Sequence, residues 1–371
     1  MAASLRVIVD AGRPPAGYDA PLSHRQATGQ PMKRVTTALT TLSAALLGAT
    51  ALPAAAEVTL TASSWLPTSH LLSRAQADWC TEVAKATQDR VKCNILPKAA
   101  APPPGTFDAV RDGLADLSFS VEGYTPGRYV LTKMAEMPFL GDSAIATSVA
   151  YERIHQKYLA KLNEHKGLKV LTVFTHGPGV IFNNQRPIKT LANLDGIKFR
   201  VGGGVVNDVG KALGVNMTLK PAPQSYELMS SGVVDGVWFP DESIVSFKLD
   251  KLVKYRTSVP GGLYNTSFAF VMNPATWAKI PKADQAIIDK FSGEWAARHF
   301  GKYWDDMDTK SRAQQQIDGI QSTQADAKFV ADFKAKTSGI EGEWIKEAEA
   351  KGLKNAGAVM KEFRAEIAKL Q

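Results

Sequence analysis

Cysteine is scarce in this chain, with two residues in 371. That excludes a small domain held together by a disulfide framework. Glycine (29) and proline (20) stand at ordinary levels, which excludes collagen-like and low-complexity chains. With 44% hydrophobic and 22% charged residues, the chain is globular and long enough for one large or two ordinary domains.

Several motifs of catalysis and cofactor binding are also missing. The chain has no G-x-S-x-G nucleophile elbow, no H-E-x-x-H zinc motif and no G-x-x-x-x-G-K-[ST] phosphate loop. Gly202-Gly203-Gly204 lies between an expected strand and an expected helix, but it lacks the G-x-G-x-x-G register of a dinucleotide site. His155, His165 and His176 fall on separate elements, so they do not predict a shared metal. We therefore expect no cofactor.

The first 56 residues have the features of an export signal. Met32-Lys33-Arg34 precedes the uncharged run 35–52, and Pro53-Ala54-Ala55-Ala56 offers the small residues that a signal peptidase recognises. We expect residues 32–56 to be a signal peptide and 1–31 to be a mis-start or a disordered extension. A membrane anchor is the alternative for the apolar run, but the run is short and rich in Thr and Ala. The mature protein is expected to be exported and soluble.

The remaining 315 residues carry 39 basic and 34 acidic side chains, a net charge of +5. The basic residues are spread along the chain, and no cluster is interleaved with aromatic residues. A nucleic-acid partner is not expected, whereas a modest attraction for small anions is.

An oxidising compartment favours a disulfide between Cys80 and Cys93. Cys80 is expected on a helix and Cys93 in the strand that follows it, which is a plausible geometry for a bridge. Two buried free thiols are the alternative. A loop of about 14 residues closed by this bridge would stabilise the fold by about 3 kcal/mol.

Strand and helix patterns alternate from residue 57 onward. This order predicts two α/β lobes with largely parallel sheets, and such sheets bind ligands beyond the carboxyl ends of their strands. The expected strands are 58–62, 91–96, 117–121, 168–174, 199–201, 217–219, 234–239 and 268–272.

Two long helices are expected, at about 144–165 and at about 281–312. The second is long enough to lie across both lobes, and the rest of the chain is expected to be helical. We assign 57–178 plus about 266–300 to the first lobe, and 179–265 plus about 301–371 to the second. Two such lobes around a cleft are typical of a receptor that closes over a small solute.

Arg200 is the main candidate for binding a ligand. It ends the expected strand 197–201, beside the glycine loop. A guanidinium in that position can hold a carboxylate by two parallel hydrogen bonds, which a lysine does less well. From the residues alone, a surface salt bridge explains Arg200 equally well.

Further candidates fall in loops or at strand ends facing the same cleft. A flat apolar acid would gain burial and stacking from the aromatic ones, although core packing explains each of them as well. The aromatic candidates are Trp65, Tyr124, Trp238, Phe239 and Tyr264, and the polar ones are His70, Glu122, Arg128, His176 and Asn265. Surface or turn roles remain open for the polar residues. Asp241 and Glu242 are weak candidates for a co-bound cation, and their position in the first turn of a helix also explains them.

Six short segments, taken together and in the order in which they occur along the chain, resemble the DctP-type periplasmic solute-binding subunits of tripartite ATP-independent periplasmic (TRAP) transporters. The resemblance extends over 57–371. The segments are Ala109–Asp116, Gly123–Arg128, Met137–Leu140, Leu194–Val201, Val234–Gly236 and Pro260–Asn265.

The resemblance implies a two-lobed periplasmic binding protein, type II-like, with a ligand cleft and a long helix spanning both lobes. It implies delivery of the solute to TRAP membrane permease subunits and no catalysis. It also implies that Arg200 pairs with the solute carboxylate and that Arg186 has a structural role. Relatives that bind sialic acid have asparagine at the position of Phe239, which favours an aromatic or keto/hydroxy carboxylate over a sugar acid. Gly202 departs from the R-V/T-P usual in the family.

Two other functions remain open at this point. A secreted hydrolase or isomerase would use Asp241, Glu242 or a histidine as acid and base, and turnover of a carboxylate would reveal it. A ligand sensor feeding a membrane kinase would use the same pocket, and the sequence does not separate it from a transport receptor.

Overall fold

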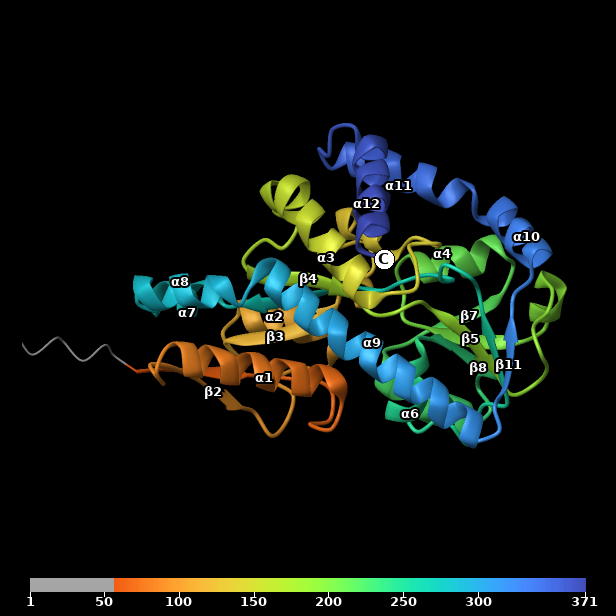
Figure 1. Cartoon of the computed structure of the whole chain (residues 1–371), viewed down its shortest axis with the longest axis horizontal. Helices are drawn as coiled ribbons and strands as arrows, with labels where there is room; N and C mark the ends of the chain where they lie inside the picture. The colour runs from red at the N-terminus through yellow and green to blue at the C-terminus, as the bar shows by residue number, and fades with distance from the viewer. Residues whose placement is uncertain (1–56) are drawn as a thin grey trace, which may run out of the picture. The chain divides into compact units, whose positions relative to one another are not determined.

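The computed structural model describes residues 57–371, which belong to one compact unit. The expected signal peptide (32–56) and extension (1–31) lie outside the described residues. The described part contains two sheets with helices packed around them (Figure 1). None of its helices is long and apolar enough to cross a membrane.

The first sheet has five strands in the order β2-β1-β3-β10-β4. These are Val91–Ile95, Val58–Ala62, Leu117–Val121, Ser267–Met272 and Lys169–Thr175. β1 is parallel to β2 and β3, but β10 runs antiparallel to both of its neighbours, with Phe268 opposite Val121 and Phe174. β1, β2, β3 and β4 therefore run in one direction, as the expectation of a largely parallel sheet requires. Within this sheet only β10 opposes them, because the chain returns from the second sheet and enters β10 at the edge where β3 and β4 end.

The second sheet has six strands in the order β11-β9-β5-β8-β6-β7. These are Gln321–Gln324, Tyr255–Ser258, Val180–Asn183, Gly236–Phe239, Lys198–Val201 and Asn216–Leu219. β5 runs antiparallel to β8 and β9. The sequence analysis missed β5, β9 and β11, which have four residues each. β11 also lies in a segment that was expected to be helical.

Twelve α-helices surround the sheets of the described part. They are α1 (Leu71–Ala86), α2 (Thr106–Arg111), α3 (Ala144–Ile154), α4 (Val205–Ala212), α5 (Ser225–Ser230), α6 (Asp241–Ser246), α7 (Pro274–Lys279), α8 (Lys282–Lys290), α9 (Gly293–Ile317), α10 (Ala327–Thr337), α11 (Gly339–Ala350) and α12 (Ala356–Leu370). The helix expected over 144–165 is α-helical only to Ile154 and continues as a π turn and a 3-10 turn to Leu162.

A break divides the helix expected over 281–312 into α8 and α9. Gly293 begins α9 with a φ of +56°, a backbone conformation that glycine adopts without steric cost. α9 contacts α1, α3 and β4 beside the first sheet and α6 beside the second (Figure 1). A long helix that spans both lobes is therefore confirmed. The last helix, α12, packs on α3 and so lies with the first lobe.

Aromatic packing fixes α9 against the first sheet. Phe300 of α9 stacks on Phe174 of β4 with 4.4 Å between ring centroids, and Phe270 of β10 lies edge-on to Trp79 of α1 at 5.1 Å. All four side chains are buried. Trp304 follows Phe300 by four residues, about one helical turn, so this packing also positions Trp304.

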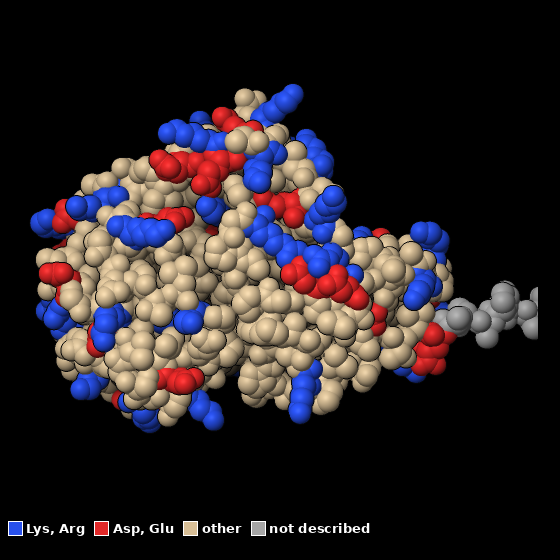
Figure 2. Space-filling model, turned by 180° about the vertical axis from the view of Figure 1, so that it is seen from behind, with Lys and Arg blue, Asp and Glu red and all other residues tan. Residues whose placement is uncertain are grey.

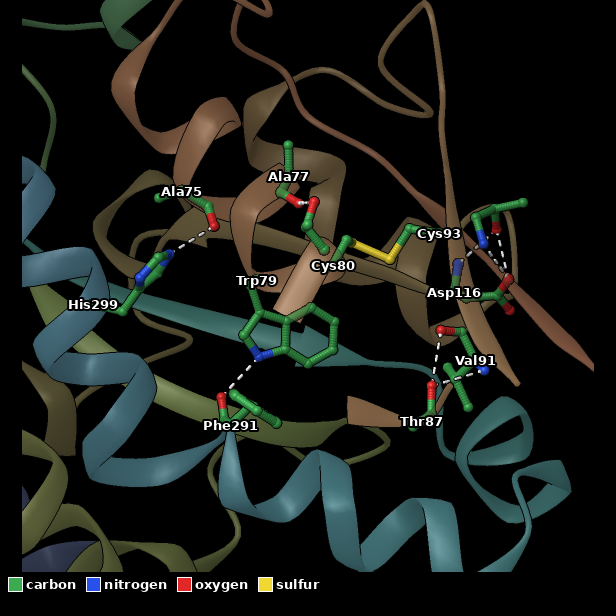
Figure 3. Close-up of a disulfide and its surroundings, with 12 residues drawn as sticks. Ala75, Ala77, Trp79, Cys80, Thr87, Val91, Cys93, Asp116, Phe291 and His299 are labelled. Carbon is green, nitrogen blue, oxygen red and sulfur yellow. Dashed lines mark hydrogen bonds between the residues drawn. A yellow bond between two sulfur atoms is a disulfide. The ribbon is translucent and has the colours of Figure 1, made fainter. Parts of the chain in front are cut away.

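The expected disulfide between Cys80 and Cys93 is present, and it joins α1 to β2 (Figure 3). The Cα atoms of the two cysteines are 5.7 Å apart, within the range that a disulfide spans. Close to it, the indole Nε1 of Trp79 donates a hydrogen bond to the Phe291 carbonyl at 2.8 Å (Figure 3). The described residues include no free cysteine.

Figure 2 shows one face of the surface, on which basic and acidic side chains lie next to one another. The face in Figure 2 does not offer the continuous basic patch that nucleic-acid binding requires. Elsewhere in the described chain, Lys302 pairs with Asp306 and Lys328 with Asp332, one helical turn apart, with 2.7 and 2.6 Å between charged atoms. Such exposed pairs are worth less than about 1 kcal/mol each.

Candidate solute-binding site

A cavity lies where strands of both sheets end. The first sheet supplies Trp65 after β1, Tyr124 after β3 and His176 after β4, and the second supplies Arg200 in β6 and Phe239 in β8. Strand carboxyl ends are the edge at which α/β sheets bind ligands. The cavity therefore has the position that the sequence predicts for a ligand site.

The structure brings many of the sequence-based candidates together at this cavity. Seven of them are among its lining residues: Trp65, His70, Tyr124, His176, Arg200, Phe239 and Tyr264. Most of the other lining side chains are apolar, so a ligand here would be surrounded mainly by hydrocarbon and aromatic surface.

Arg200 is buried, with 1% of its surface exposed. Its Nε donates to the Lys220 carbonyl at 2.8 Å, and its guanidinium carbon lies 4.4 Å from the centroid of the Phe239 ring. Within the described part of the chain, no carboxylate forms a salt bridge with it. The surface salt bridge considered from the sequence is therefore absent. Burial lowers the pKa of Arg200, but a guanidinium stays charged at any physiological pH.

A buried cation without an anionic partner is costly. Arg200 is the one lining residue with a permanent charge, since Asp, Glu and Lys are absent from the cavity wall. The site therefore has an electrostatic preference for an anion, and a carboxylate matches the fork of the guanidinium.

Tyr124 lies beside Arg200 and joins the two lobes. Its hydroxyl oxygen accepts a hydrogen bond from the backbone N–H of Ala222, which follows β7, at 3.0 Å. Burial raises the pKa of Tyr124, so the hydroxyl keeps its proton. The oxygen is used by Ala222, and the proton remains available to donate to a bound anion.

Both histidines of the cavity are neutral, and their hydrogen bonds fix their tautomers. Nδ1 of His176 is hydrogen-bonded to the Gly177 carbonyl, which can only accept, so Nδ1 carries the proton. Burial lowers the pKa of His176 to about 4. Nδ1 of His70 accepts from the Leu72 N–H at 3.2 Å, which puts its proton on Nε2, 3.6 Å from Glu242. Burial also lowers the pKa of His70.

Several lining residues were not foreseen from the sequence, and Trp304 is the most distant along the chain. It lies on α9, more than one hundred residues after Arg200. No local pattern marks it, because its place at the cavity depends on how α9 crosses the two lobes. Phe247, after α6, is a second such residue; its ring stacks on Phe239 with 5.6 Å between centroids.

Other candidates lie away from the cavity. Trp238 is fully buried and packs on Phe199, because successive residues of a strand point to opposite faces and Phe239 takes the cavity side. Arg128 instead pairs with Asp108 at 2.8 Å. For these two residues the structure gives packing and ion-pair roles.

Glu122 and Asn265 are buried but do not line the cavity. A carboxylate oxygen of Glu122 lies 2.5 Å from Nε2 of His165, and the other accepts from the Tyr151 hydroxyl at 3.1 Å. Asn265 donates its backbone N–H to the Glu136 carbonyl at 3.3 Å. Both side chains are therefore separated from the expected ligand.

The arrangement of Asp241 and Glu242 does not favour a cation site. Arg256 holds Asp241 through two hydrogen bonds of 2.6 and 2.7 Å. Glu242 is bonded to Ser243 and Ser246. Among residues 57–371 no group of three or more His, Cys, Asp or Glu side chains could hold a metal.

The glycine loop 202–204 contacts the other lobe and does not form a phosphate site. A carboxylate oxygen of Glu136 accepts from the N–H of Val205, the first residue of α4, at 2.8 Å. This acidic side chain occupies the place that a phosphate would take at a helix N-terminus.

Residues 62–347 match the model of the DctP family, bacterial extracellular solute-binding protein, family 7. The chain belongs to this family. The DctP family supplies the periplasmic solute-binding subunits of TRAP transporters, so the protein is an extracytoplasmic receptor for small organic acids and not an enzyme. It works with TRAP membrane permease subunits, and the hydrolase or isomerase alternative is excluded.

Three similar proteins set the DctP chain in context. A TRAP periplasmic solute-binding protein of Bordetella bronchiseptica, solved with (R)- and (S)-mandelate, has 43% identity and a TM-score of 0.83, covering 85% of this chain and all of that one. A marine metagenome TRAP protein specific for aromatic acids, solved with 3-hydroxybenzoate, has 33% identity and a TM-score of 0.79, covering 85% of this chain and 99% of that one. The outer membrane transporter protein TsaT of Comamonas testosteroni is 30% identical, covering 78% of this chain and 86% of that one.

Proposed function

We propose that this DctP subunit captures an aromatic carboxylate in the cavity between its lobes. Arg200 and Tyr124 hold the carboxylate group, and the aromatic wall holds the ring. The observation that carries this proposal is the buried guanidinium of Arg200, which has no acidic partner among the described residues and lies over the Phe239 ring.

The chemistry of the wall favours an aromatic ring over a polyhydroxylated chain. Phe239, Phe247 and Phe268 present carbon surface to the cavity. A sugar acid would need several hydrogen-bond partners there, and each hydroxyl buried without one is costly. An aromatic ring instead gains from burial and from offset or edge contacts. Two of the similar proteins above were solved with aromatic acids bound, which supports the same class of ligand.

Capture in this proposal ends with closure of the two lobes over the ligand. In this proposal the chain crosses between the lobes near residues 178 and 265, and α12 belongs to the first lobe because it packs on α3. The bonds from Tyr124 to Ala222 and from Glu136 to Val205 join the lobes next to the cavity. Closure excludes water from the ion pair at Arg200 and strengthens it.

Thermal unfolding with a matched set of small molecules tests this proposal. Benzoate should raise the melting temperature, with a stabilisation of about 2.7 kcal/mol at one hundred times its Kd. Benzamide has the same ring without the charge and should give no shift. Glucuronate, an acid without an aromatic ring, should give a smaller shift than benzoate. An equal shift with benzamide would contradict the role of Arg200, and a larger shift with glucuronate would contradict the aromatic class.

A further inference from the structure

The side chains around the cavity form a closed circuit, and Trp304 lies across it from Arg200. In one direction Arg200 covers Phe239, whose ring stacks on Phe247, and the Phe247 ring lies 5.6 Å from that of His70. The His70 ring is 6.4 Å from Trp304. The carboxylate end and the Trp304 end of the cavity are therefore separated by aromatic side chains.

In the other direction the circuit passes through Tyr264 and His176. Arg200 and Tyr264 both line the cavity. The His176 ring lies 5.4 Å from that of Tyr264 and 5.7 Å from that of Trp304. His176 and Trp304 are thus neighbours, and among the described ring and cation contacts neither touches Arg200 directly.

Trp304 has a hydrogen-bond donor without a partner. Its side chain is 3% exposed, and its indole Nε1 makes no hydrogen bond within the described part of the chain. Buried polar groups are nearly always hydrogen-bonded, so an unpaired indole N–H at a cavity wall points to an acceptor supplied from outside the protein. By contrast, the indole Nε1 of Trp65 donates to the Phe119 carbonyl at 3.0 Å.

His176 supplies the complementary acceptor. Because Nδ1 donates to the Gly177 carbonyl, Nε2 carries a lone pair, and no hydrogen bond to it is formed by residues 57–371. Burial holds the ring in this neutral state. In the other cavity histidine, His70, Nδ1 accepts from the Leu72 N–H and Nε2 faces Glu242 at 3.6 Å.

We propose that Trp304 and His176 form a binding site for a phenolic hydroxyl of the ligand, at the end of the cavity opposite Arg200. The Trp304 N–H donates to the hydroxyl oxygen, and the hydroxyl donates its proton to Nε2 of His176. This inference rests on the proposed function and narrows it to aromatic carboxylates with a hydroxyl at ring position 3 or 4. A hydroxyl at position 2 lies next to the carboxylate and does not reach this site.

Calorimetric titration of the unmodified protein with benzoate and its three monohydroxy derivatives tests the inference. The 3- or the 4-hydroxy acid should bind about tenfold or more tightly than benzoate, since two hydrogen bonds to buried groups are gained. The 2-hydroxy acid should not show this gain. Equal affinities for all four acids, or a gain for the 2-hydroxy acid alone, would overturn the hydroxyl site while leaving the proposed function intact. Absence of binding by any of them would overturn the proposed function itself.

Two variants test whether Nε1 of Trp304 and Nε2 of His176 cause the tighter binding of the hydroxylated acid. Trp304→Phe removes the N–H, and His176→Asn keeps a donor near the Gly177 carbonyl while it removes the acceptor. In each variant the affinity of the hydroxylated acid should come within about twofold of the affinity of benzoate for the same variant. Trp277→Phe, on α7 and away from the cavity, is the control and should keep the full advantage. An advantage that persists in both site variants would contradict the assignment, and circular dichroism verifies folding.

Discussion

At the residue scale, the cavity depends on which buried polar atoms the protein itself satisfies. Most have partners: Tyr264 donates its hydroxyl to the Trp238 carbonyl at 2.8 Å, and Ser243 donates to Glu242 at 3.2 Å. Three groups that line the cavity are exceptions among the described residues: the charge of Arg200 has no acidic partner, and Nε1 of Trp304 and Nε2 of His176 make no hydrogen bond. Because burial without a partner is costly, these unsatisfied groups identify what a ligand has to supply.

Substitution of Tyr124 by phenylalanine tests its role at this scale. The change removes the acceptor of the Ala222 N–H and the hydroxyl that faces the anion. We expect the affinity for benzoate to fall about tenfold, mainly through faster dissociation, because a buried hydrogen bond between the lobes is lost. Stopped-flow fluorescence measures this rate. Tyr129→Phe is the control, since the Tyr129 hydroxyl is buried without a partner in the described part. Equal dissociation rates in both variants would refute the role of Tyr124.

The free energy of unfolding should fall in mild acid because His155 is buried in its neutral form. Burial lowers its pKa to about 4 from an ordinary value of 6.5. The unfolded chain takes up a proton below pH 6.5 while the folded protein does not, so this residue lowers the free energy of unfolding as pH falls from 6.5 towards 4. In His155→Gln the loss between pH 7 and pH 5 should be smaller than in the unmodified protein by about 1 to 2 kcal/mol. Urea unfolding at both pH values measures it, and an identical loss in the two proteins would contradict the expectation.

At the element scale, α1 is held from two sides. The disulfide links it to β2, and Trp79 links it to Phe291 in the junction between α8 and α9 (Figure 3). The bridge closes a short loop far from the cavity. Its effect is therefore on stability and not on the geometry of the site.

Replacing both cysteines, Cys80→Ser with Cys93→Ser, should lower the free energy of unfolding by about 3 kcal/mol, since the unfolded chain regains the entropy of a loop with a separation of 13 residues. Benzoate affinity at 25 °C should stay within about twofold of the unmodified protein, because Cys80 and Cys93 do not line the cavity. Chemical denaturation measures the free energy of unfolding, and calorimetry measures the affinity for benzoate. Unchanged stability would show that the bridge does not constrain the unfolded chain.

The sequence predicts those elements whose signal is local. Arg200 and Phe239 were found because each lies at or next to the end of an expected strand. Trp304 and Phe247 were missed because their place at the cavity arises from the packing of helices that are distant in sequence. β11 was missed because its four residues, QSTQ, are polar and mostly exposed, and the parallel pairing with β9 that makes it a strand is a tertiary contact. The antiparallel course of β10 likewise depends on where the chain crosses between the sheets.

At the scale of the whole molecule, the two lobes meet through backbone as well as side chains. A Cβ atom on Gly123, after β3, would lie 3.0 Å from the backbone of Gly203, in the loop after β6. Real Cβ atoms rarely come so close to backbone atoms, so this contact needs glycine. The three consecutive glycines of this loop thus allow the lobes to approach next to the cavity.

Gly123→Ala should therefore hinder closure. We expect about tenfold weaker benzoate binding and a larger radius of gyration in the presence of benzoate than in the unmodified protein, because the added methyl group separates the lobes. Small-angle scattering measures the radius of gyration, and calorimetry measures the affinity for benzoate. Gly105→Ala is the control, since its added Cβ would have ordinary contacts at 3.4 Å or more. Equal radii for the two variants with benzoate would contradict the closure account.

The most direct test of the whole account is the affinity of Arg200→Met for benzoate, measured by calorimetry beside the unmodified protein. Methionine keeps much of the side-chain volume and removes the buried charge, so the variant should fold with similar stability while binding benzoate about a hundredfold or more weakly. Arg128→Ala, whose guanidinium pairs with Asp108 outside the cavity, should bind as the unmodified protein does. Binding by Arg200→Met within about tenfold of the unmodified protein would contradict the claim that this guanidinium holds the solute.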